Sequence, residues 1–388
     1  MKNIGIIAEY NPMHLGHIHQ IKAIKEKYPQ SNIIVLMSGS FVQRGEPSIL
    51  NKFDKAEIAI KNGVDLVLEM PSIISLQSAD YFAYYSTMIL NNLNILDYLS
   101  FGVESEDFTS LLTNFEAIYL NINMIENEIQ TYLDQGFSYK QSYIRSLEKL
   151  GIDSSFMKEP NNTLAFNYYK SLRELKSTIN VLPIFRNDNG YNNDEVADKN
   201  FQSASTIRKL VEENKDISAY VPLESKIKLE KSPKYHLDDY SDLFYYKSFI
   251  SQKDPSLIAG YEPGLLNLLN KNYDETLSNS IDLSHNKRHS KARLRRFIFN
   301  YLLDITTDDI DSLDKINYIR PLAFNDKGRQ VLKEIKYKSD IVIVNKFTDI
   351  KDNCNKNLVN IDIKSYKLHN IRSKQLNSLD YTHMPYIK

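Results

Sequence analysis

Buried-strand and amphipathic-helix patterns alternate along the first hundred residues of the chain. The apolar runs that predict strands lie at residues 4–10, 32–37, 64–70 and 95–102. The helical patterns between them lie at residues 17–28, 52–63 (ending at Gly63) and 78–93. Apolar runs separated by helices of about a dozen residues indicate βαβ units and a parallel sheet covered on both faces. The expected fold class is therefore α/β, with a Rossmann-like doubly wound parallel sheet.

The pattern becomes mainly helical between residues 105 and 178. An apolar run at 179–185 then predicts a further strand. The segment SASTIRKLVEEN, residues 203–214, predicts a helix that begins at a hydroxyl cap, either Ser203 or Ser205. This alternation extends the α/β region to about residue 215.

A loosely patterned connection around Pro222 and Pro233 separates this region from the rest of the chain. Beyond this connection the chain is helical in pattern to about residue 320, and residues 318–346 predict a turn, a helix and a strand-like run. We therefore predict two domains, an α/β domain at 1–215 and a mainly helical domain at 216–388. A length of 388 residues is also more than one average domain needs.

The composition restricts the class of protein. A hydrophobic content of 42% and a charged content of 25% are typical of a soluble globular protein. The net charge of −1 gives no overall attraction to nucleic acid, so such a partner requires a local basic patch. The single cysteine, Cys354, excludes an internal disulfide framework and any CxxC site. With neither a signal-peptide pattern nor an apolar run long enough to span a membrane, we expect a cytoplasmic protein.

The stretch EYNPMHLGH, residues 9–17, lies between the first predicted strand and the first predicted helix. Ligands of doubly wound sheets bind at the carboxyl ends of the strands, where helix N-termini attract anions. His14 and His17 are candidate donors to a phosphate there, and Gly16 allows close approach. A zinc site would need a third ligand, and Pro12 and Gly16 favour a loop over a helix interior. Two ordinary polar turn residues are the third interpretation, and we favour the phosphate site.

A second motif, SASTIR at 203–208, places the hydroxyls of Ser203, Ser205 and Thr206 at a helix start, followed by Arg208. These residues would suit a phosphate-binding helix terminus, but alone the motif is a weak signal because such helix starts are common caps. Together with HxGH after the first strand, it resembles the nucleotidylyltransferase superfamily. Members of that superfamily bind ATP and transfer its adenylyl group, with release of pyrophosphate.

A closer resemblance runs along most of the chain. The segments that carry it are GIIAEYNPMHLGH, MSGSFVQRGEPSILNKFDKAEIAI, DLVLEMPS, FGVES, EPNNTLAFNY, SASTIR, KRHSKARLRRFIF and YIRPLAFNDKGRQVL. The sequence resembles the bacterial tRNA(Met) cytidine acetate ligase family. That family joins acetate to ATP as acetyl-adenylate and transfers the acetyl group to the exocyclic amine of the wobble cytidine of elongator tRNA(Met), which gives N4-acetylcytidine.

The resemblance implies a set of site residues. His14 and His17 correspond to the catalytic histidine pair. The implied ATP-binding residues are Ile7, Ala8, Glu9, Tyr10, Asn11, Pro12, His14, Gly16, His17, Gln20, Gly102, Asn161, Arg186, Ser205 and Arg208. The chain has Met13 and Leu15 where the family has Phe and Asn, and RNDNGYNND where a His-Asp element follows the arginine. Mg²⁺ is expected as the phosphate counter-ion, without an assigned protein ligand.

Two further segments carry basic residues. Arg44, Lys52 and Lys55 follow the second predicted strand and would bind phosphate or tRNA, or else belong to an exposed polar loop with Asp54 and Glu57 as salt-bridge partners. The stretch HNKRHSKARLRRF, residues 285–297, contains no acidic residue. Its candidate tRNA-binding residues are Lys287, Arg288, Lys291, Arg293, Arg295 and Arg296. An ordinary surface stripe is the alternative, and we favour contacts with tRNA phosphates. Leu294 and Phe297 are expected to face the core, which would make the basic stripe one-sided.

The first hypothesis for the function is thus an ATP-dependent acetate ligase with a catalytic domain at 1–215 and a tRNA-binding domain at 216–388. A small-molecule adenylyltransferase is the alternative enzyme, although such enzymes are usually compact single domains. An RNA-binding protein on a non-catalytic nucleotidyltransferase scaffold is the non-enzyme alternative. Intact His14, Gly16, His17 and Arg208 favour catalysis.

Overall fold

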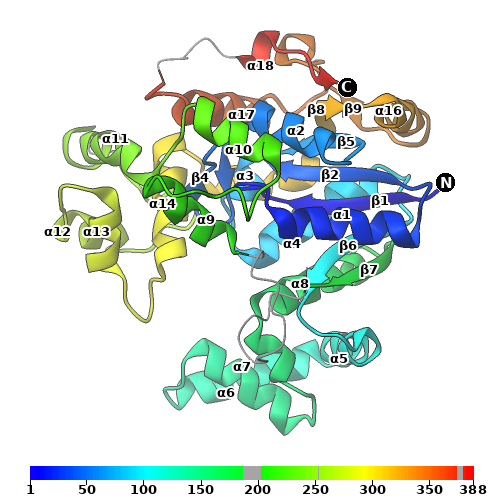
Figure 1. Cartoon of the computed structure of the whole chain (residues 1–388). Coiled ribbons are helices and arrows are strands. Elements are labelled where there is room, and N and C mark those ends of the chain that lie inside the picture. The colour runs from blue at the N-terminus through cyan, green and yellow to red at the C-terminus, as the bar shows by residue number, and fades with distance from the viewer. Residues whose placement is uncertain (187–201, 252, 374–378) are drawn as a thin grey trace.

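A mostly parallel sheet forms the centre of the computed structural model, which describes residues 1–186, 202–251, 253–373 and 379–388 (Figure 1). Within the described residues its strand order is β10-β8-β5-β2-β1-β6-β7, with β9 beside β8. The strands are β1 (Asn3–Ala8), β2 (Asn32–Ser38), β5 (Leu66–Met70), β6 (Tyr98–Val103), β7 (Asn180–Phe185), β8 (Tyr318–Phe324), β9 (Val342–Ile343) and β10 (Tyr386–Ile387). A separate antiparallel hairpin joins β3 (Phe41–Val42) to β4 (Glu46–Pro47).

The central strand β2 shows why the apolar runs form this sheet. All seven of its residues are buried. Ile33, Val35 and Met37 enter one hydrophobic cluster, while Ile34 and Leu36 enter the cluster on the opposite face. Successive side chains of a strand point to opposite faces, so a strand covered on both sides must be apolar throughout. The predicted doubly wound α/β class is confirmed, with the predicted strands as β1, β2, β5, β6 and β7.

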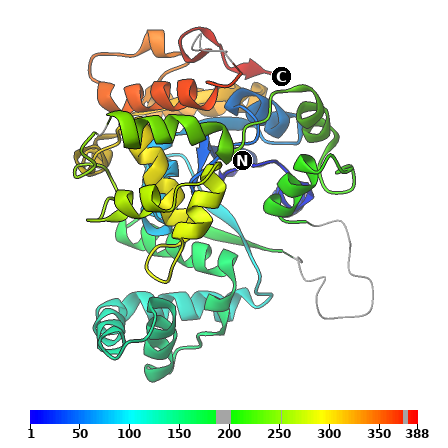
Figure 2. The ribbon, with the colours of Figure 1, turned by 90° about the vertical axis from the view of Figure 1, so that its left-hand side faces the viewer.

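Helices cover both faces of the sheet (Figures 1 and 2). In the first half of the chain they are α1 (Leu15–Lys27), α2 (Lys52–Lys61), α3 (Ser72–Ser75), α4 (Ala79–Asn92), α5 (Phe108–Leu120), α6 (Ile122–Asp134), α7 (Tyr139–Lys149) and α8 (Pro160–Glu174). The later helices are α9 (Ala204–Glu212), α10 (Leu223–Lys231), α11 (Ser241–Tyr245), α12 (Leu265–Lys271), α13 (Leu277–Ser284), α14 (Lys291–Leu303), α15 (Thr307–Asp311), α16 (Asp326–Lys338), α17 (Lys356–His369) and α18 (Leu379–Thr382). Helices α1, α2, α9 and α10 share one cluster, and α4, α8, α14 and α17 share the other.

The order of the parallel strands creates a switch point between β1 and β6. From β1 the chain proceeds to β2 and β5 on one side, then crosses to β6 and β7 on the other side. The connections leave β1 and β6 in opposite directions, so a crevice opens at their carboxyl ends, where ligands of such sheets bind. The loop after β1 carries the HxGH motif, and β6 carries Gly102.

The segment at 318–324 differs from its prediction. It forms the strand β8, antiparallel to β5, where we expected a turn. Pro321 interrupted the apolar run, and Arg320 placed a charge within it. Arg320 is nevertheless only 2% exposed, because Glu69 and Asp380 neutralise it, and the register shifts next to Pro321, between Val67 and Leu68.

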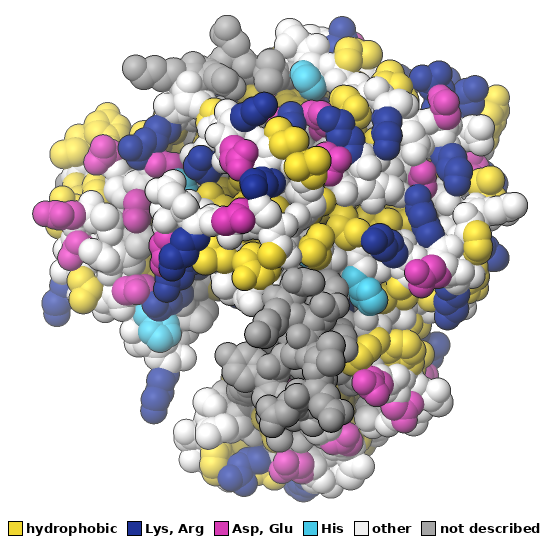
Figure 3. Space-filling view, in the orientation of Figure 1, with side chains coloured by type: hydrophobic (Ala, Val, Ile, Leu, Met, Phe, Trp, Pro, Cys, Tyr) yellow, Lys and Arg dark blue, Asp and Glu magenta, His cyan; other side chains and the backbone are white. Residues whose placement is uncertain are grey.

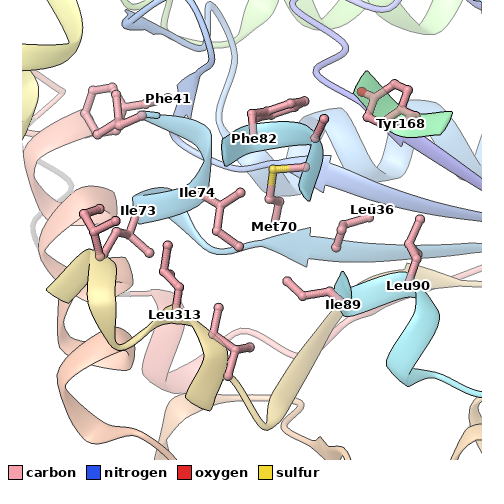
Figure 4. Close-up of a cluster of buried hydrophobic side chains, with 14 of the residues drawn as sticks. Leu36, Phe41, Met70, Ile73, Ile74, Phe82, Ile89, Leu90, Tyr168 and Leu313 are labelled. Atoms are coloured by element: carbon pink, nitrogen blue, oxygen red, sulfur yellow. The ribbon is translucent and has the colours of Figure 1, made fainter. Parts of the chain in front are cut away.

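The C-terminal residues pack closely against the N-terminal ones. In one apolar cluster Leu313 lies beside Ile73 and Ile74, against the face of the sheet that carries Leu36 (Figure 4). Strands β8 and β10 also add to the sheet begun by the first hundred residues. The division into domains at about residue 215 stays a prediction, and the sheet takes strands from both sides of it.

Two parts of the described chain project from this body. Helices α5, α6 and α7 extend below the sheet, and the loop between α13 and α14 extends outward beside them (Figures 1 and 2). None of the helices in the described residues is both long and apolar enough to cross a lipid bilayer.

Candidate active site

His14 is the N-cap of helix α1. Its Nδ1 accepts a hydrogen bond from the backbone N–H of Gly16 at 3.1 Å, and Nδ1 of His17 accepts from the backbone N–H of His14 at 3.1 Å. The helix therefore begins at Leu15, and our predicted start at His17 was wrong. The reason is that an imidazole here occupies the capping position that Ser, Thr, Asp or Asn usually takes.

These hydrogen bonds fix the tautomer of both rings. In a neutral imidazole one nitrogen donates and the other accepts, so accepting at Nδ1 places the proton on Nε2. The two rings lie 3.8 Å apart between centroids and are tilted by 30°. His14 and His17 thus offer a pair of Nε2–H donors at the N-terminus of a helix, where backbone N–H groups also attract anions.

Both histidines are neutral at physiological pH. Burial, and secondarily the positive charge of Arg186, lower the pKa of His14 to about 3. The pKa of His17, which is partly exposed, is also held well below its ordinary value by desolvation, His14 and Arg186. Neutral donors remain able to bind phosphate oxygens without repelling Arg186.

Arg186 lies directly over two glycines of the crevice. A Cβ added to Gly102 would lie 2.4 Å from Cδ of Arg186 and 2.9 Å from its Cγ. A Cβ added to Gly16 would lie 3.0 Å from Cε1 of His14 and 3.4 Å from Nη2 of Arg186. Only glycine leaves room for this arrangement, so the HxGH loop, β6 and the end of β7 meet around one guanidinium.

Asn161, at the start of α8, completes this side of the crevice. Its Oδ1 accepts a hydrogen bond from Nη1 of Arg186 at 3.4 Å, and its Nδ2 donates to Oε1 of Glu104 at 2.5 Å. Glu104 also accepts from the backbone N–H of Asn161 at 3.2 Å, and Oδ1 of Asn162 accepts from the backbone N–H of Glu104. The structure therefore brings together Gly102, Asn161 and Arg186 as predicted. We had not singled out Glu104, although it follows the end of β6 within FGVES.

The SASTIR motif lies beside the HxGH loop. Ser203 caps α9 through Oγ, which accepts from the backbone N–H of Thr206 at 3.2 Å and lies 2.8 Å from Oγ of Ser205. Arg208 donates to the backbone oxygen of Asn11 at 2.8 Å and pairs with Glu46 of the β3–β4 hairpin at 2.5 Å. The two motifs thus meet through Arg208, which shares the carboxylate of Glu46 with Arg295.

Other residues of the loop hold its shape. Oε1 of Glu9 accepts from the backbone N–H of Gln43 at 2.8 Å, and Oδ1 of Asn11 accepts from that of Ile49 at 2.7 Å. The ring of Tyr10 meets His17 edge-on at 4.8 Å, and Gln20 donates to Oγ of Ser100 at 3.3 Å. Ile7 and Ala8 end β1, and Pro12 lies in the turn after it. These contacts hold the HxGH loop in a single conformation.

The lysines after β2 have structural roles. Lys52 is 1% exposed and pairs with Glu69 at 2.6 Å and Asp380 at 2.5 Å. Lys55 is buried and donates to the backbone oxygens of Ser38 and Gly39 and to Oγ of Ser48. Both predictions, a phosphate or tRNA contact and an exposed loop, were wrong for these two lysines because the segment is folded into the core.

The two acidic residues that were expected to pair with this basic segment pair with other lysines. Asp54 pairs with Lys228 at 2.6 Å, and Glu57 pairs with Lys61 and Lys228. Arg44 is exposed in the β3–β4 turn and stays a candidate.

Acidic residues from other segments pair with most of the basic stretch. Arg288 and Arg293 both pair with Glu262, Lys291 pairs with Asp282, and Arg295 pairs with Glu46. Lys287 is exposed in the projecting loop before α14. The predicted inward orientation of Leu294 and Phe297 is confirmed, since they are 0% and 1% exposed. On the face shown in Figure 3, Lys and Arg side chains are interspersed with Asp and Glu.

The described residues contain no group of three or more His, Cys, Asp or Glu side chains that could hold a metal ion. The hydrogen bonds of His14 and His17 through Nδ1 favour the phosphate interpretation of the motif, because these contacts fix both rings as donors at Nε2.

A pH dependence arises from the neutral state of His14. In the unfolded chain its pKa returns to about 6.5, so the unfolded state binds a proton between about pH 6.5 and 3 that the folded state does not. The stability that this group contributes is therefore lost as the pH falls below about 6.5. We expect the difference in unfolding free energy between the wild type and His14→Asn to decrease by about 2 kcal/mol from pH 7.5 to 5.0, measured by urea denaturation. A constant difference would mean that folded His14 binds a proton.

Comparison with known proteins places these features in context. The family model described as HIGH Nucleotidyl Transferase matches residues 1–383. Two proteins named tRNA(Met) cytidine acetate ligase, from Clostridium botulinum and Clostridium acetobutylicum, are each 34% identical, over 99% and 98% of this chain and 98% of their own length. The crystal structure of Thermotoga maritima TmcAL bound with alpha-thio ATP matches with a TM-score of 0.87 and 24% identity, over 100% of this chain and 99% of that chain. The apo form of that protein gives the same values, so the chains share one fold.

Proposed function

The chain belongs to the HIGH nucleotidyl transferase family and, within it, to the tRNA(Met) cytidine acetate ligases, and from this membership we propose how its site works. It activates acetate with ATP as acetyl-adenylate and transfers the acetyl group to the exocyclic amine of the wobble cytidine of elongator tRNA(Met), forming N4-acetylcytidine. The observation that carries this proposal is the pair of neutral Nε2–H donors, His14 and His17, beside Arg186 at the switch point.

The first step is an in-line displacement at the α-phosphorus of ATP. A carboxylate oxygen of acetate forms a bond to phosphorus while the bond to the β-phosphate oxygen breaks, and its electrons leave with pyrophosphate. Acetate is already ionised, so no proton has to be moved. His14, His17 and the N-terminus of α1 stabilise the charge that gathers on the leaving pyrophosphate. Arg186, held by Asn161 over Gly102, adds a positive charge beside the two histidines.

In the second step the wobble amine attacks the acetyl carbonyl carbon, and the bond from that carbon to the phosphate oxygen breaks. AMP leaves with the bonding electrons, and the amine releases one proton to solvent. Acetyl-adenylate must be protected from water before this happens. Mg²⁺ would accompany the phosphates of ATP, with the nucleotide and water supplying its ligands, because it binds readily through substrate phosphates. Basic residues at 287–295 would bind the tRNA backbone, and we expect the activity in the cytoplasm, where a tRNA substrate is found.

Isotope exchange tests the first step. Incubation with ATP and labelled pyrophosphate should move label into ATP only when acetate is present. No acetate-dependent exchange, with or without tRNA, would contradict the ligase. It would leave a small-molecule adenylyltransferase, which needs its own acceptor for exchange, and a non-catalytic RNA-binding protein. Exchange without tRNA acetylation would retain adenylate chemistry but contradict the proposed product.

The substitution Gly102→Ala should reduce acetate-dependent exchange about 10²-fold, because displacing a positioned group by about 1 Å has effects of that size. The new methyl group would occupy the space of Cδ of Arg186 and force its guanidinium away from Asn161. The melting temperature should stay close to that of the wild type, since Gly102 is only partly buried. Unchanged exchange would mean that Arg186 does not take part in the formation of acetyl-adenylate.

A further inference from the structure

A second cavity, of about 470 Å³, lies between α14 and the start of α4. Its walls include Gln77 and Tyr81 from the α3–α4 region and Arg296, Phe297 and Asn300 from one face of α14. The size is within the ~300–1,000 Å³ range of small-molecule sites. The cavity is therefore large enough to receive a single nucleobase.

Two polar side chains that line this cavity lack a full set of partners among the described residues. Arg296 is half-buried and has no carboxylate partner among the described residues, and its Nη1 donates to the backbone oxygen of Gln43 at 3.3 Å. Asn300 is 2% exposed, and its Nδ2 donates to the backbone oxygen of Ala259 at 3.1 Å. That contact fixes the orientation of the amide and leaves the buried Oδ1 without a hydrogen-bond partner in the described chain. An unsatisfied buried acceptor is costly unless a ligand completes it.

Gln43 connects this cavity to the HxGH loop. Its backbone N–H donates to Glu9 of the loop, its side chain donates to the backbone oxygen of Gln77, and its backbone oxygen accepts from Arg296. The hairpin that carries it also lies tightly on α14. Gly45 has φ +69°, and a Cβ there would lie 2.5 Å from the backbone nitrogen of Arg296. One residue thus links the loop that would hold acetyl-adenylate to two walls of the cavity.

We propose that this cavity receives the acceptor base, a cytosine turned out of its RNA strand. The Watson–Crick edge of cytosine presents acceptors at O2 and N3 and a donor at N4. Arg296 supplies donors for the two acceptors, and Oδ1 of Asn300 accepts from the N4 amine. Tyr81, which is 48% exposed, provides an aromatic surface for stacking. The proposal rests on the proposed function and extends it to the residues that select the base.

The charges of the wall favour a neutral base over a phosphate. Glu262 already pairs with Arg293, and Asp311 adds an exposed carboxylate to the same cavity. Uracil fits this wall less well, since it presents a donor at N3, where Arg296 also donates, and an acceptor at O4, where Asn300 also accepts. The cavity should therefore distinguish cytosine from uracil.

Three measurements on the full-length protein test the assignment. They are acetate-dependent pyrophosphate exchange, acetyl transfer at saturating tRNA, and binding of cytidine and uridine by saturation-transfer NMR. Arg296→Gln and Tyr81→Leu should each slow transfer roughly 10- to 100-fold and weaken the cytidine signal, while exchange stays within about twofold. Tyr81→Phe, which keeps the ring, and the surface substitution Arg329→Gln should behave like the wild type.

The outcomes separate this proposal from the proposed function. A wild-type protein that binds cytidine better than uridine but shows no acetate-dependent exchange would contradict the function and support the cavity. Intact exchange with unchanged transfer in Arg296→Gln would contradict the cavity alone. A higher KM for tRNA with a shallower salt dependence and unchanged kcat would make Arg296 a phosphate contact and overturn the proposal. Equal binding of cytidine and uridine would also overturn it.

Discussion

Replacing His14 by asparagine should reduce acetate-dependent pyrophosphate exchange by about 10²–10³-fold, the usual effect of removing one donor to developing charge. Asparagine is among the best N-cap residues, so its side chain can still accept from the backbone N–H of Gly16 and keep α1 in place. The substitution removes the Nε2–H group, which we propose donates to the phosphates. The loss should therefore be in the chemical step.

A second histidine of the same helix provides the matched control. His19 is exposed, and its Nε2 lies 3.3 Å from the backbone oxygen of Phe185, outside the histidine pair. His19→Asn should leave exchange close to the wild-type rate. If His14→Asn keeps more than about a tenth of the exchange while remaining folded, His14 does not have the proposed role.

The substitution Asp380→Asn should destabilise the protein by about 3–5 kcal/mol, the usual cost of removing one partner from a buried ion pair. The carboxylate of Asp380 pairs with Lys52 at 2.5 Å and with Arg320, and Glu69 pairs with both cations. All four side chains are at most 3% exposed. Without Asp380, two buried cations would share a single carboxylate.

Urea denaturation measures this effect, and a surface pair provides its control. Asp352 is fully exposed and pairs with Lys356 at 2.8 Å. Asp352→Asn should leave the unfolding free energy close to that of the wild type, as is typical of exposed pairs. A loss of similar size in both variants would mean that the Asp380 network does not stabilise the attachment of the C-terminal segment to the core.

The sequence predicts the central strands well because both faces of β2, β1 and β5 are covered and the runs are mostly apolar, with Glu69 as the one charged residue among these three strands. Strand β8 could not be predicted in this way. Its charge at Arg320 is neutralised by Asp380, sixty residues away along the chain, and by Glu69. The same long-range pairing misled the interpretation of Lys52, since a local pattern does not reveal a buried partner on a distant segment.

The candidate site likewise combines residues that a local pattern predicts with long-range contacts that it does not. The HxGH histidines and Arg208 are predictable because their motif spacing is local. The contacts that organise them are not, because Glu46 joins Arg208 to Arg295 and Glu104 joins β6 to Asn161 across long stretches of chain. From the sequence alone, a carboxylate in a loop is as readily interpreted as an exposed surface residue as it is a partner of an arginine in the site.

The most direct test of the account is the identity of the product. The protein should be incubated with ATP, carbon-13-labelled acetate and an elongator tRNA(Met) transcript, and the tRNA digested and analysed by mass spectrometry. We predict labelled N4-acetylcytidine at the wobble position, dependent on ATP and lost in His14→Asn. An unmodified wobble cytidine would contradict the account if the protein is folded and active in pyrophosphate exchange. Acetylation at another position would also contradict it.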